Sequence, residues 1–141
     1  MALFKFVVSD KERTVQMEKD QKDCFVLGKK IGDNIGGDFL GLDGYELKIT
    51  GGHDKNGFAM RNDIDGISKR TVLLTKGIGF SSRVKRKKKL KRTVHGLRKR
   101  KTIRGNTITE EVVQINCKIT KTGSKSLNEI VPPKQKSEKT E

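Results

Sequence analysis

The chain of 141 residues suits one domain with a short tail. It carries 32 Lys and Arg against 17 Asp and Glu, a formal net charge of +15, and only 32% of its residues are hydrophobic, with no Trp. The low hydrophobic content excludes a large core and a membrane span. The two cysteines lie far apart in the sequence, which excludes a disulfide scaffold or a zinc cluster. The positive charge predicts a polyanionic partner.

The predicted secondary structure begins with a β-hairpin. Residues 3–8 and 13–18 are predicted strands, and in the second of them Val15 and Met17 alternate with polar neighbours. The polar loop between the two strands suits a hairpin connection. A short apolar run, residues 24–27, follows and ends at Gly28. The N-terminal run is too short for a signal peptide and Lys5 interrupts it, so we expect a soluble protein that is not secreted.

Glycine dominates the next segment, residues 28–57, which holds nine of the fifteen glycines. This density disfavours a long helix and predicts tight turns in which glycine adopts positive φ. The Asp43-Gly44 pair is a turn signal, and residues 45–50 after it alternate as a half-buried strand.

The second half contains the clearest strand of the chain. Residues 71–75 and 101–104 are short β-rich runs, and Gly105-Asn106 is predicted to be a turn that leads into residues 107–109. Residues 111–120 alternate, which predicts one apolar face and one polar face, formed by Val113, Ile115, Cys117 and Ile119 and by Gln114, Asn116 and Lys118.

Helix is almost absent from the predicted structure. Residues 126–131 suit one helical turn, and the polar tail, residues 132–141, is expected to be disordered. The predicted fold is therefore all-β, a small barrel-like domain of short strands with Gly-rich turns that spans residues 1–131. A basic insert occupies about residues 81–104.

Positive charge is concentrated in residues 69–104. No Asp or Glu occurs from Gly66 to Thr109, a span with 16 of the 32 Lys and Arg residues, whereas the rest of the chain has 16 basic and 17 acidic residues. Such self-repulsion disfavours folding unless a polyanion neutralises it, so we expect the insert to be extended or irregular and ordered by RNA. Binding through backbone phosphates should weaken steeply with salt.

The predicted RNA contacts are the cations of this stretch, one histidine within it and two cations of the preceding loop: Lys55, Arg61, Lys69, Arg70, Lys76, Arg83, Lys85, Arg86, Lys87, Lys88, Lys89, Lys91, Arg92, His95, Arg98, Lys99, Arg100, Lys101 and Arg104. Tyr45 and Phe80 are the aromatic candidates for stacking on bases, which favours recognition of RNA shape over sequence. The loop at residues 51–61 is either a plain connection or a phosphate site that includes the N–H groups of Gly51 and Gly52.

Catalytic and metal-binding motifs fail at specific positions. Residues 77–82 begin like a dinucleotide fingerprint, but Ser82 replaces the third glycine. Residues 52–57 have the glycine spacing of a phosphate-binding loop without the Lys and the Ser or Thr that must follow. His53 beside Asp54 has no third ligand nearby. We therefore expect no catalytic residue, metal, cofactor or small-molecule substrate.

A longer motif carries a family resemblance. Residues 44–60, with the sequence GYELKITGGHDKNGFAM, resemble the signature of the e-type small-subunit ribosomal protein six of archaea and eukaryotes, with Ala59 in place of its usual proline. Residues 70–77, 98–106 and 112–123 are similar to further blocks of that family. The short chain looks like the archaeal form, because eukaryotic members continue into a long basic helix with regulatory serines.

The resemblance implies an all-β, barrel-like body docked on the lower part of the small ribosomal subunit. It also implies contacts with ribosomal RNA and neighbouring ribosomal proteins, in the cytoplasm. The alternative function is a free nucleic-acid-binding regulator, although the chain shows neither a helix-turn-helix pattern nor a dimer interface. Binding to an anionic membrane is a third idea, and it would require an amphipathic helix that residues 83–104 lack.

Overall fold

The computed structural model describes residues 3–11, 13–85, 91–123, 125 and 127–130. Within these ranges it contains nine strands, two short 3-10 helices (Gln21–Asp23 and Asp38–Leu40) and one turn of α-helix, α1 (Leu127–Ile130). The predominance of strands confirms the all-β prediction, and α1 confirms the predicted helical turn. The predicted polar tail, residues 132–141, lies outside the described residues.

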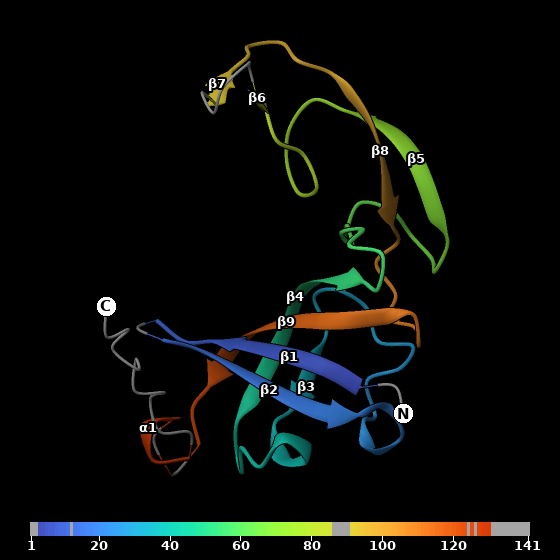
Figure 1. The fold of residues 1–141 in the computed structure, drawn as a ribbon. Coiled ribbons are helices and arrows are strands. Elements are labelled where there is room, and N and C mark those ends of the chain that lie inside the picture. Colours follow the sequence, from blue (N-terminus) through green and yellow to red (C-terminus); the bar gives the residue numbers. More distant parts are fainter. Residues whose placement is uncertain (1–2, 12, 86–90, 124, 126, 131–141) are drawn as a thin grey trace, which may run out of the picture.

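A curled five-stranded sheet forms the body of the molecule (Figure 1). The strand order is β2-β1-β9-β4-β3, with bounds Leu3–Ser9 (β1), Thr14–Asp20 (β2), Asn34–Gly36 (β3), Glu46–Asp54 (β4) and Val112–Lys121 (β9). β1 is antiparallel to β2 and parallel to β9, while β4 is antiparallel to both β3 and β9. The first strand of the chain therefore pairs with the last, and the body requires both ends of the sequence.

One face of this sheet carries the hydrophobic core. Alternation along β1 buries Phe4, Phe6 and Val8 completely. Phe6 also packs edge-on against Phe39, with ring centroids 5.3 Å apart. The short apolar run at residues 24–27 leads into a turn at residues 25–28, and the structure buries Cys24 and Val26 from it in the same core.

β9 departs from its predicted alternation at one end. Val112 is fully buried, whereas Val113, predicted on the core face, is only half-buried. The pairing with β4 shifts between His53 and Asp54, where one residue of β9 is passed over. An extra residue of this kind reverses the side to which the neighbouring side chains point. The predicted apolar face is therefore wrong at Val113, because a bulge interrupts the period of two.

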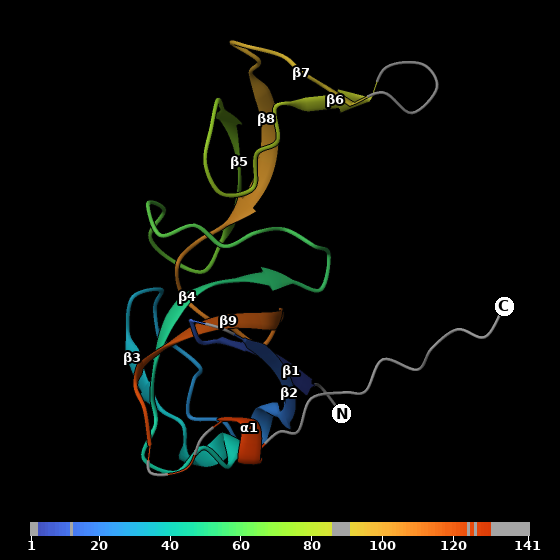
Figure 2. The ribbon, with the colours of Figure 1, turned by 90° about the vertical axis from the view of Figure 1, so that its left-hand side faces the viewer.

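We call residues 69–104 the arm, and its described residues, 69–85 and 91–104, project from the body (Figures 1 and 2). An antiparallel ribbon of β5 (Lys69–Leu74) and β8 (Lys99–Arg104) makes its base, and a hairpin of β6 (Arg83–Lys85) and β7 (Lys91–Thr93) lies farther out. The β5–β8 ribbon confirms the β-rich runs predicted at residues 71–75 and 101–104. Within the insert, which was expected to be extended or irregular, β6 and β7 are paired strands. Pairing satisfies the backbone polar groups of a segment that has too few apolar residues to form a core.

Candidate nucleic-acid interface

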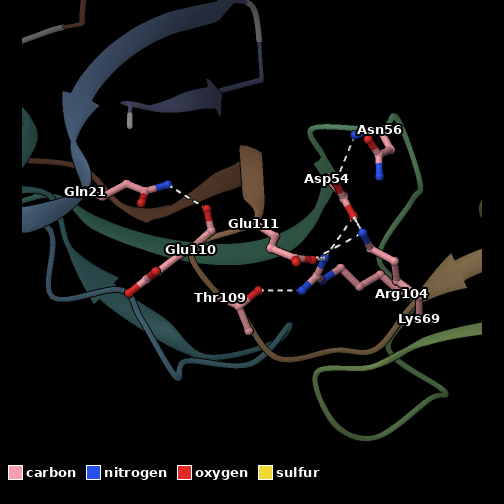
Figure 3. Close-up of polar contacts among 8 residues, drawn as sticks. All are labelled: Gln21, Asp54, Asn56, Lys69, Arg104, Thr109, Glu110 and Glu111. Carbon is pink, nitrogen blue, oxygen red and sulfur yellow. Dashed lines mark hydrogen bonds and ion pairs between the residues drawn. The ribbon is translucent and has the colours of Figure 1, made fainter. Parts of the chain in front are cut away.

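Four charged side chains join the arm to the body (Figure 3). Asp54 ends β4 and Glu111 precedes β9, whereas Lys69 begins β5 and Arg104 ends β8. Asp54 Oδ2 lies 2.8 Å from both Lys69 Nζ and Arg104 Nη1, and Glu111 Oε2 lies 3.2 and 2.6 Å from the same two nitrogens. Arg104 Nη2 also donates to Thr109 Oγ1 at 2.6 Å. We call the four charged residues the neck network.

The centre of the neck network is removed from solvent. The side chains of Asp54 and Arg104 are 0% and 4% exposed. Burial alone would raise the pKa of the Asp54 carboxyl, but hydrogen bonds from Lys69, the Asn56 amide and Arg104 outweigh it and hold that pKa below its ordinary value. Hydrogen bonds from Arg104 and Lys69 lower the pKa of Glu111 as well. Two acids and two bases therefore stay ionised together and cancel in charge.

The loop after β4 positions Asp54. The Asp54 N–H donates to Phe58 O at 3.0 Å, the Gly57 N–H donates to Asp54 O at 2.8 Å, and the Asn56 N–H donates to Asp54 Oδ1 at 2.9 Å. Gly57 has φ +79°, a conformation that favours glycine. The ring of Phe58 lies 5.9 Å from Lys69 Nζ, within reach of a cation–π contact. This turn holds the Asp54 carboxylate that pairs with Lys69 and Arg104 at the base of the arm.

Gly51 and Gly52 do not serve as the phosphate site that was one of two interpretations of this loop. Both are buried within β4, so that interpretation is wrong for their N–H groups. A Cβ on Gly52 would lie 2.5 Å from Gln114 O and 3.0 Å from Met60 Sδ. Close packing of β4 against β9 therefore explains Gly52.

Gly105 and Asn106, predicted to be a turn, lie where the chain crosses residues 64–68. A Cβ on Gly105 would lie only 1.9 Å from Gly66 O, so no larger residue fits this crossing. The Asn106 side chain fixes it, donating to Asp65 Oδ1 at 2.8 Å and accepting from the Gly66 N–H at 3.3 Å. Residues 107–109 then form an isolated bridge through Thr107 instead of the predicted strand.

The structure leaves most of the predicted RNA contacts that it describes at the surface. One group is exposed and forms no ion pair within the described part of the chain: Lys55, Arg70, Lys76, Arg83, His95, Arg98, Arg100 and Lys101. Lys99 is half-buried and donates to Ser81 O at 3.5 Å. Arg86, Lys87, Lys88 and Lys89 lie outside the described residues, as do the side chains of Lys85, Lys91 and Arg92.

Three other predicted contacts bind groups of the chain itself. Arg104 and Lys69 belong to the neck network. Arg61 donates from Nε and Nη2 to the Asp63 carboxylate at 2.8 and 2.6 Å, and from Nη1 to Ile78 O at 2.9 Å. These contacts tie the base of the arm together. The charged groups of Arg61, Lys69 and Arg104 therefore bind acceptors within the protein.

Aromatic side chains are placed differently from the predicted stacking candidates. Tyr45 is buried, and its hydroxyl donates to Lys125 O at 2.6 Å, while Phe80 is half-buried. Phe25 is instead 91% exposed. Its neighbours Cys24 and Val26 are both buried. Residues 24–27 are all apolar in the sequence, so no alternation marked Phe25 as the exposed one.

The remaining candidate groups are the two cysteines and the side chains that could hold a metal ion. Cys24 and Cys117 are buried, which confirms their prediction as core residues. Burial raises the pKa of the Cys117 thiol to about 12, so it stays protonated and unreactive. The described residues contain no group of three or more His, Cys, Asp or Glu side chains placed to hold a metal ion. None of the helices they form has the length and apolar character needed to cross a membrane.

A curled β body that holds out an acid-free cationic ribbon defines a protein built to meet a polyanion. Residues 4–132 match the family described as Ribosomal protein S6e, and the chain belongs to that family. This membership confirms the resemblance seen in residues 44–60. The family is ribosomal, in agreement with the expectation that the chain is not an enzyme.

Three curated relatives show how much of the chain the similarity covers. Each carries the name small ribosomal subunit protein eS6, and each comes from an archaeon. The relative from Methanosphaera stadtmanae is 46% identical over 91% of this chain and 92% of its own. The relative from Methanothermobacter thermautotrophicus is 43% identical over 91% of this chain and 94% of its own. The relative from Methanocella arvoryzae is 42% identical over 98% of this chain and 92% of its own.

Proposed function

We propose that this protein is a structural constituent of the small ribosomal subunit and binds ribosomal RNA through phosphate contacts of its arm. It would act in the cytoplasm, beside neighbouring ribosomal proteins, and support translation without catalysing a step. The observation that carries the proposal is the arm itself, a paired ribbon and hairpin with no acid from Gly66 to Thr109. The names of the relatives support the same assignment.

The neck network explains how such an arm can fold before it meets RNA. Asp54 and Glu111 neutralise the two cations at its base, where the chain needs close packing. Within the part of the chain that the structure describes, the exposed cations farther along the arm form no ion pair and would remain for phosphates. Each phosphate that they neutralise releases counterions, which favours binding at low salt. The arm would then screen the repulsion between RNA helices that must lie close together.

Neutralising three arm lysines tests this proposal. Lys87→Gln, Lys88→Gln and Lys89→Gln together should weaken binding to archaeal small-subunit ribosomal RNA and flatten the plot of log affinity against log KCl concentration. The slope should fall by about 2, since each phosphate contact contributes roughly 0.7–0.9. Filter binding between about 0.1 and 0.4 M KCl measures both quantities, a range in which phosphate contacts dominate the change.

The matched control removes the same charge from the body. Lys22, Lys29 and Lys48 are exposed lysines outside the arm. The triple variant in which all three are replaced by Gln should leave the slope of log affinity against log KCl concentration close to that of the natural chain. Equal slopes for the arm variant and the natural chain would remove these lysines from the interface. An equal loss in both variants would mean that net charge alone drives binding.

The alternative function, a free nucleic-acid-binding regulator, differs in where the protein resides. A ribosomal constituent should sediment with small subunits when a native lysate is separated on a sucrose gradient at low salt. A regulator would remain at the top of the gradient. Chain that stays at the top in lysates with intact subunits would refute the ribosomal proposal.

A further inference from the structure

The two faces of the β5–β8 ribbon have different chemistry. Side chains alternate between the two faces along each strand, and residues paired directly across the two strands lie on the same face. The register therefore assigns one face, the inner face, to the pairs Arg70–Ile103, Val72–Lys101 and Leu74–Lys99, and the opposite, outer face to Lys69–Arg104, Thr71–Thr102 and Leu73–Arg100.

The inner face finds its apolar cover within the chain. Ile103 and Leu74 are only 1% and 7% exposed. A Cβ on Gly79 would lie 3.4 Å from Ile103 Cγ2, so the connection after β5 packs on this face. Figure 1 shows that connection, residues 75–82, on the concave side of the arm. On the inner face the two apolar side chains Leu74 and Ile103 are thus covered by protein, whereas Arg70 and Lys101 remain exposed.

The outer face is open above the neck network. Leu73 is 57% exposed and pairs directly with Arg100, which is also exposed. Next to them, the hydroxyl oxygens of Thr71 and Thr102 lie 3.3 Å apart across the two strands. A single exposed leucine is ordinary on a protein surface. Here it lies between two hydroxyls and a guanidinium on a face without acid, which points to a polyanion with an apolar, hydroxyl-bearing surface.

We propose that this outer face, formed by Thr71, Leu73, Arg100 and Thr102, packs into the minor groove of an RNA double helix. The inference rests on the proposed RNA-binding function and specifies which part of the RNA this ribbon meets. The minor groove of A-form RNA is wide, shallow and lined by ribose 2′-hydroxyls. Threonine hydroxyls can exchange hydrogen bonds with those groups, Leu73 can pack on the ribose, and Arg100 can bind a phosphate at the groove edge.

Two other partners fit this face less well. Unpaired bases would need aromatic side chains to stack on, and Phe80 is the one Phe, Tyr or Trp from Gly66 to Thr109. It is half-buried and does not belong to the ribbon. A protein partner would meet the exposed Arg100 on a ribbon that carries no acid of its own, which disfavours contact with the mostly basic proteins of a ribosome.

Arg100 and Lys101 give a matched pair for testing the face. They are adjacent in β8, both exposed and on opposite faces, and each loses one charge on substitution by Gln. Arg100→Gln should weaken binding of the chain to archaeal small-subunit ribosomal RNA by about tenfold, the size of one charged hydrogen bond. Lys101→Gln should weaken it much less. Equal effects, or a larger effect at Lys101, would overturn the proposal.

The threonines test the groove. The variant with Thr71→Val and Thr102→Val keeps the shape of the ribbon, and valine suits strands, so it should fold. The natural chain should be competed off ribosomal RNA better by an RNA duplex of about twenty base pairs than by the DNA duplex of the same sequence. The double variant should lose most of that preference. A preference that survives unchanged, or a single-stranded RNA that competes best, would refute groove binding.

These outcomes separate the inference from the function on which it rests. If the Lys87, Lys88 and Lys89 variant still loses affinity while Arg100→Gln does not, the arm binds RNA and the outer face is not the contact. If a photoreactive residue at position 73 attaches to a protein in purified small subunits, the occupant is protein and the inference fails. If neither variant affects RNA binding, both proposals fail together.

Discussion

The body and the arm reach a folded state by different means. The body buries a continuous cluster of apolar side chains, including Phe4, Phe6, Leu47 and Ile115, against one curled sheet. Among the described residues of the arm, only Leu74 and Ile103 are buried hydrophobic residues. Burial of apolar surface can stabilise the body by itself, whereas the arm depends on strand pairing and on its attachment at the neck.

This difference shows how one chain keeps both a fold and an unneutralised charge. Cations at the base of the arm are paired with acids of the body, so the attachment carries little net charge. Among the described cations farther along the arm, Arg70, Arg83, Arg100 and Lys101 are exposed. The neck network therefore divides the basic stretch into a part that stabilises the protein and a part proposed to bind RNA.

Removing the buried acid of the neck network, Asp54, should cause the largest loss of stability in the protein. Asp54→Asn leaves the enclosed Arg104 guanidinium with Glu111 as its remaining acid, and loss of one partner from a buried pair destabilises by about 3 kcal/mol or more. Urea denaturation monitored by circular dichroism measures this change. Lys69→Met, which leaves the Asp54–Arg104 pair intact, should cost clearly less. Equal losses would show that the pair is not the anchor.

The second largest loss of stability is expected from a larger side chain at Gly105, where the chain crosses residues 64–68. Gly105→Ala places a methyl group against Gly66 O, and overpacking of this kind destabilises by about 1–3 kcal/mol. Gly51→Ala is the control, because nothing lies within 4 Å of its Cβ position and its φ is not in the left-handed region. Thermal unfolding of the two variants compares them. If Gly105→Ala is as stable as Gly51→Ala, the crossing is not closely packed.

The pH dependence should be the smallest effect and the most specific. The folded chain lowers the pKa of Asp54 and Glu111 below their ordinary values of 3.8 and 4.5, so their contribution is complete above those values and is lost as pH falls through the lowered ones. A hydrogen bond to Asp54 raises the pKa of Lys69 above 10.5, so that contribution is lost only as pH rises through the raised value.

The measurement compares urea midpoints of the natural chain at pH 7 and at about pH 3, below the ordinary values of both carboxyls. The natural chain should lose stability at the lower pH, and Asp54→Asn should lose less because it has already lost one of these carboxylates. If the urea midpoints of the two proteins fall by the same amount, the acid sensitivity belongs to groups outside the neck network.

Alternation and glycine placement in the sequence predicted much of the body. The β1–β2 hairpin, the strand after Asp43-Gly44 and the turn after β4 all follow from short-range patterns. The errors have local causes in the tertiary structure. A bulge moved the core face of β9 from Val113 to Val112, and a chain crossing, which no local pattern reveals, replaced the turn at Gly105.

The candidate site was predicted in composition more than in arrangement. The sequence identified the exposed cations of the arm as a group, because an acid-free run of this length is visible by counting. It also assigned Arg104 to RNA, although the structure encloses its side chain with Asp54, which lies fifty positions earlier in the chain. It missed the exposed Phe25 and the division of the ribbon into two faces.

The sequence by itself therefore determined the class of fold, the family and the positive charge of the arm, since periodicity, motif and charge are properties of neighbouring residues. Only the tertiary structure decided which cations are available. Ion pairing depends on distances between segments far apart in the chain, and strand pairing decides which side of a ribbon each residue occupies. The motif that identifies the family turns out to hold the arm in place through Asp54.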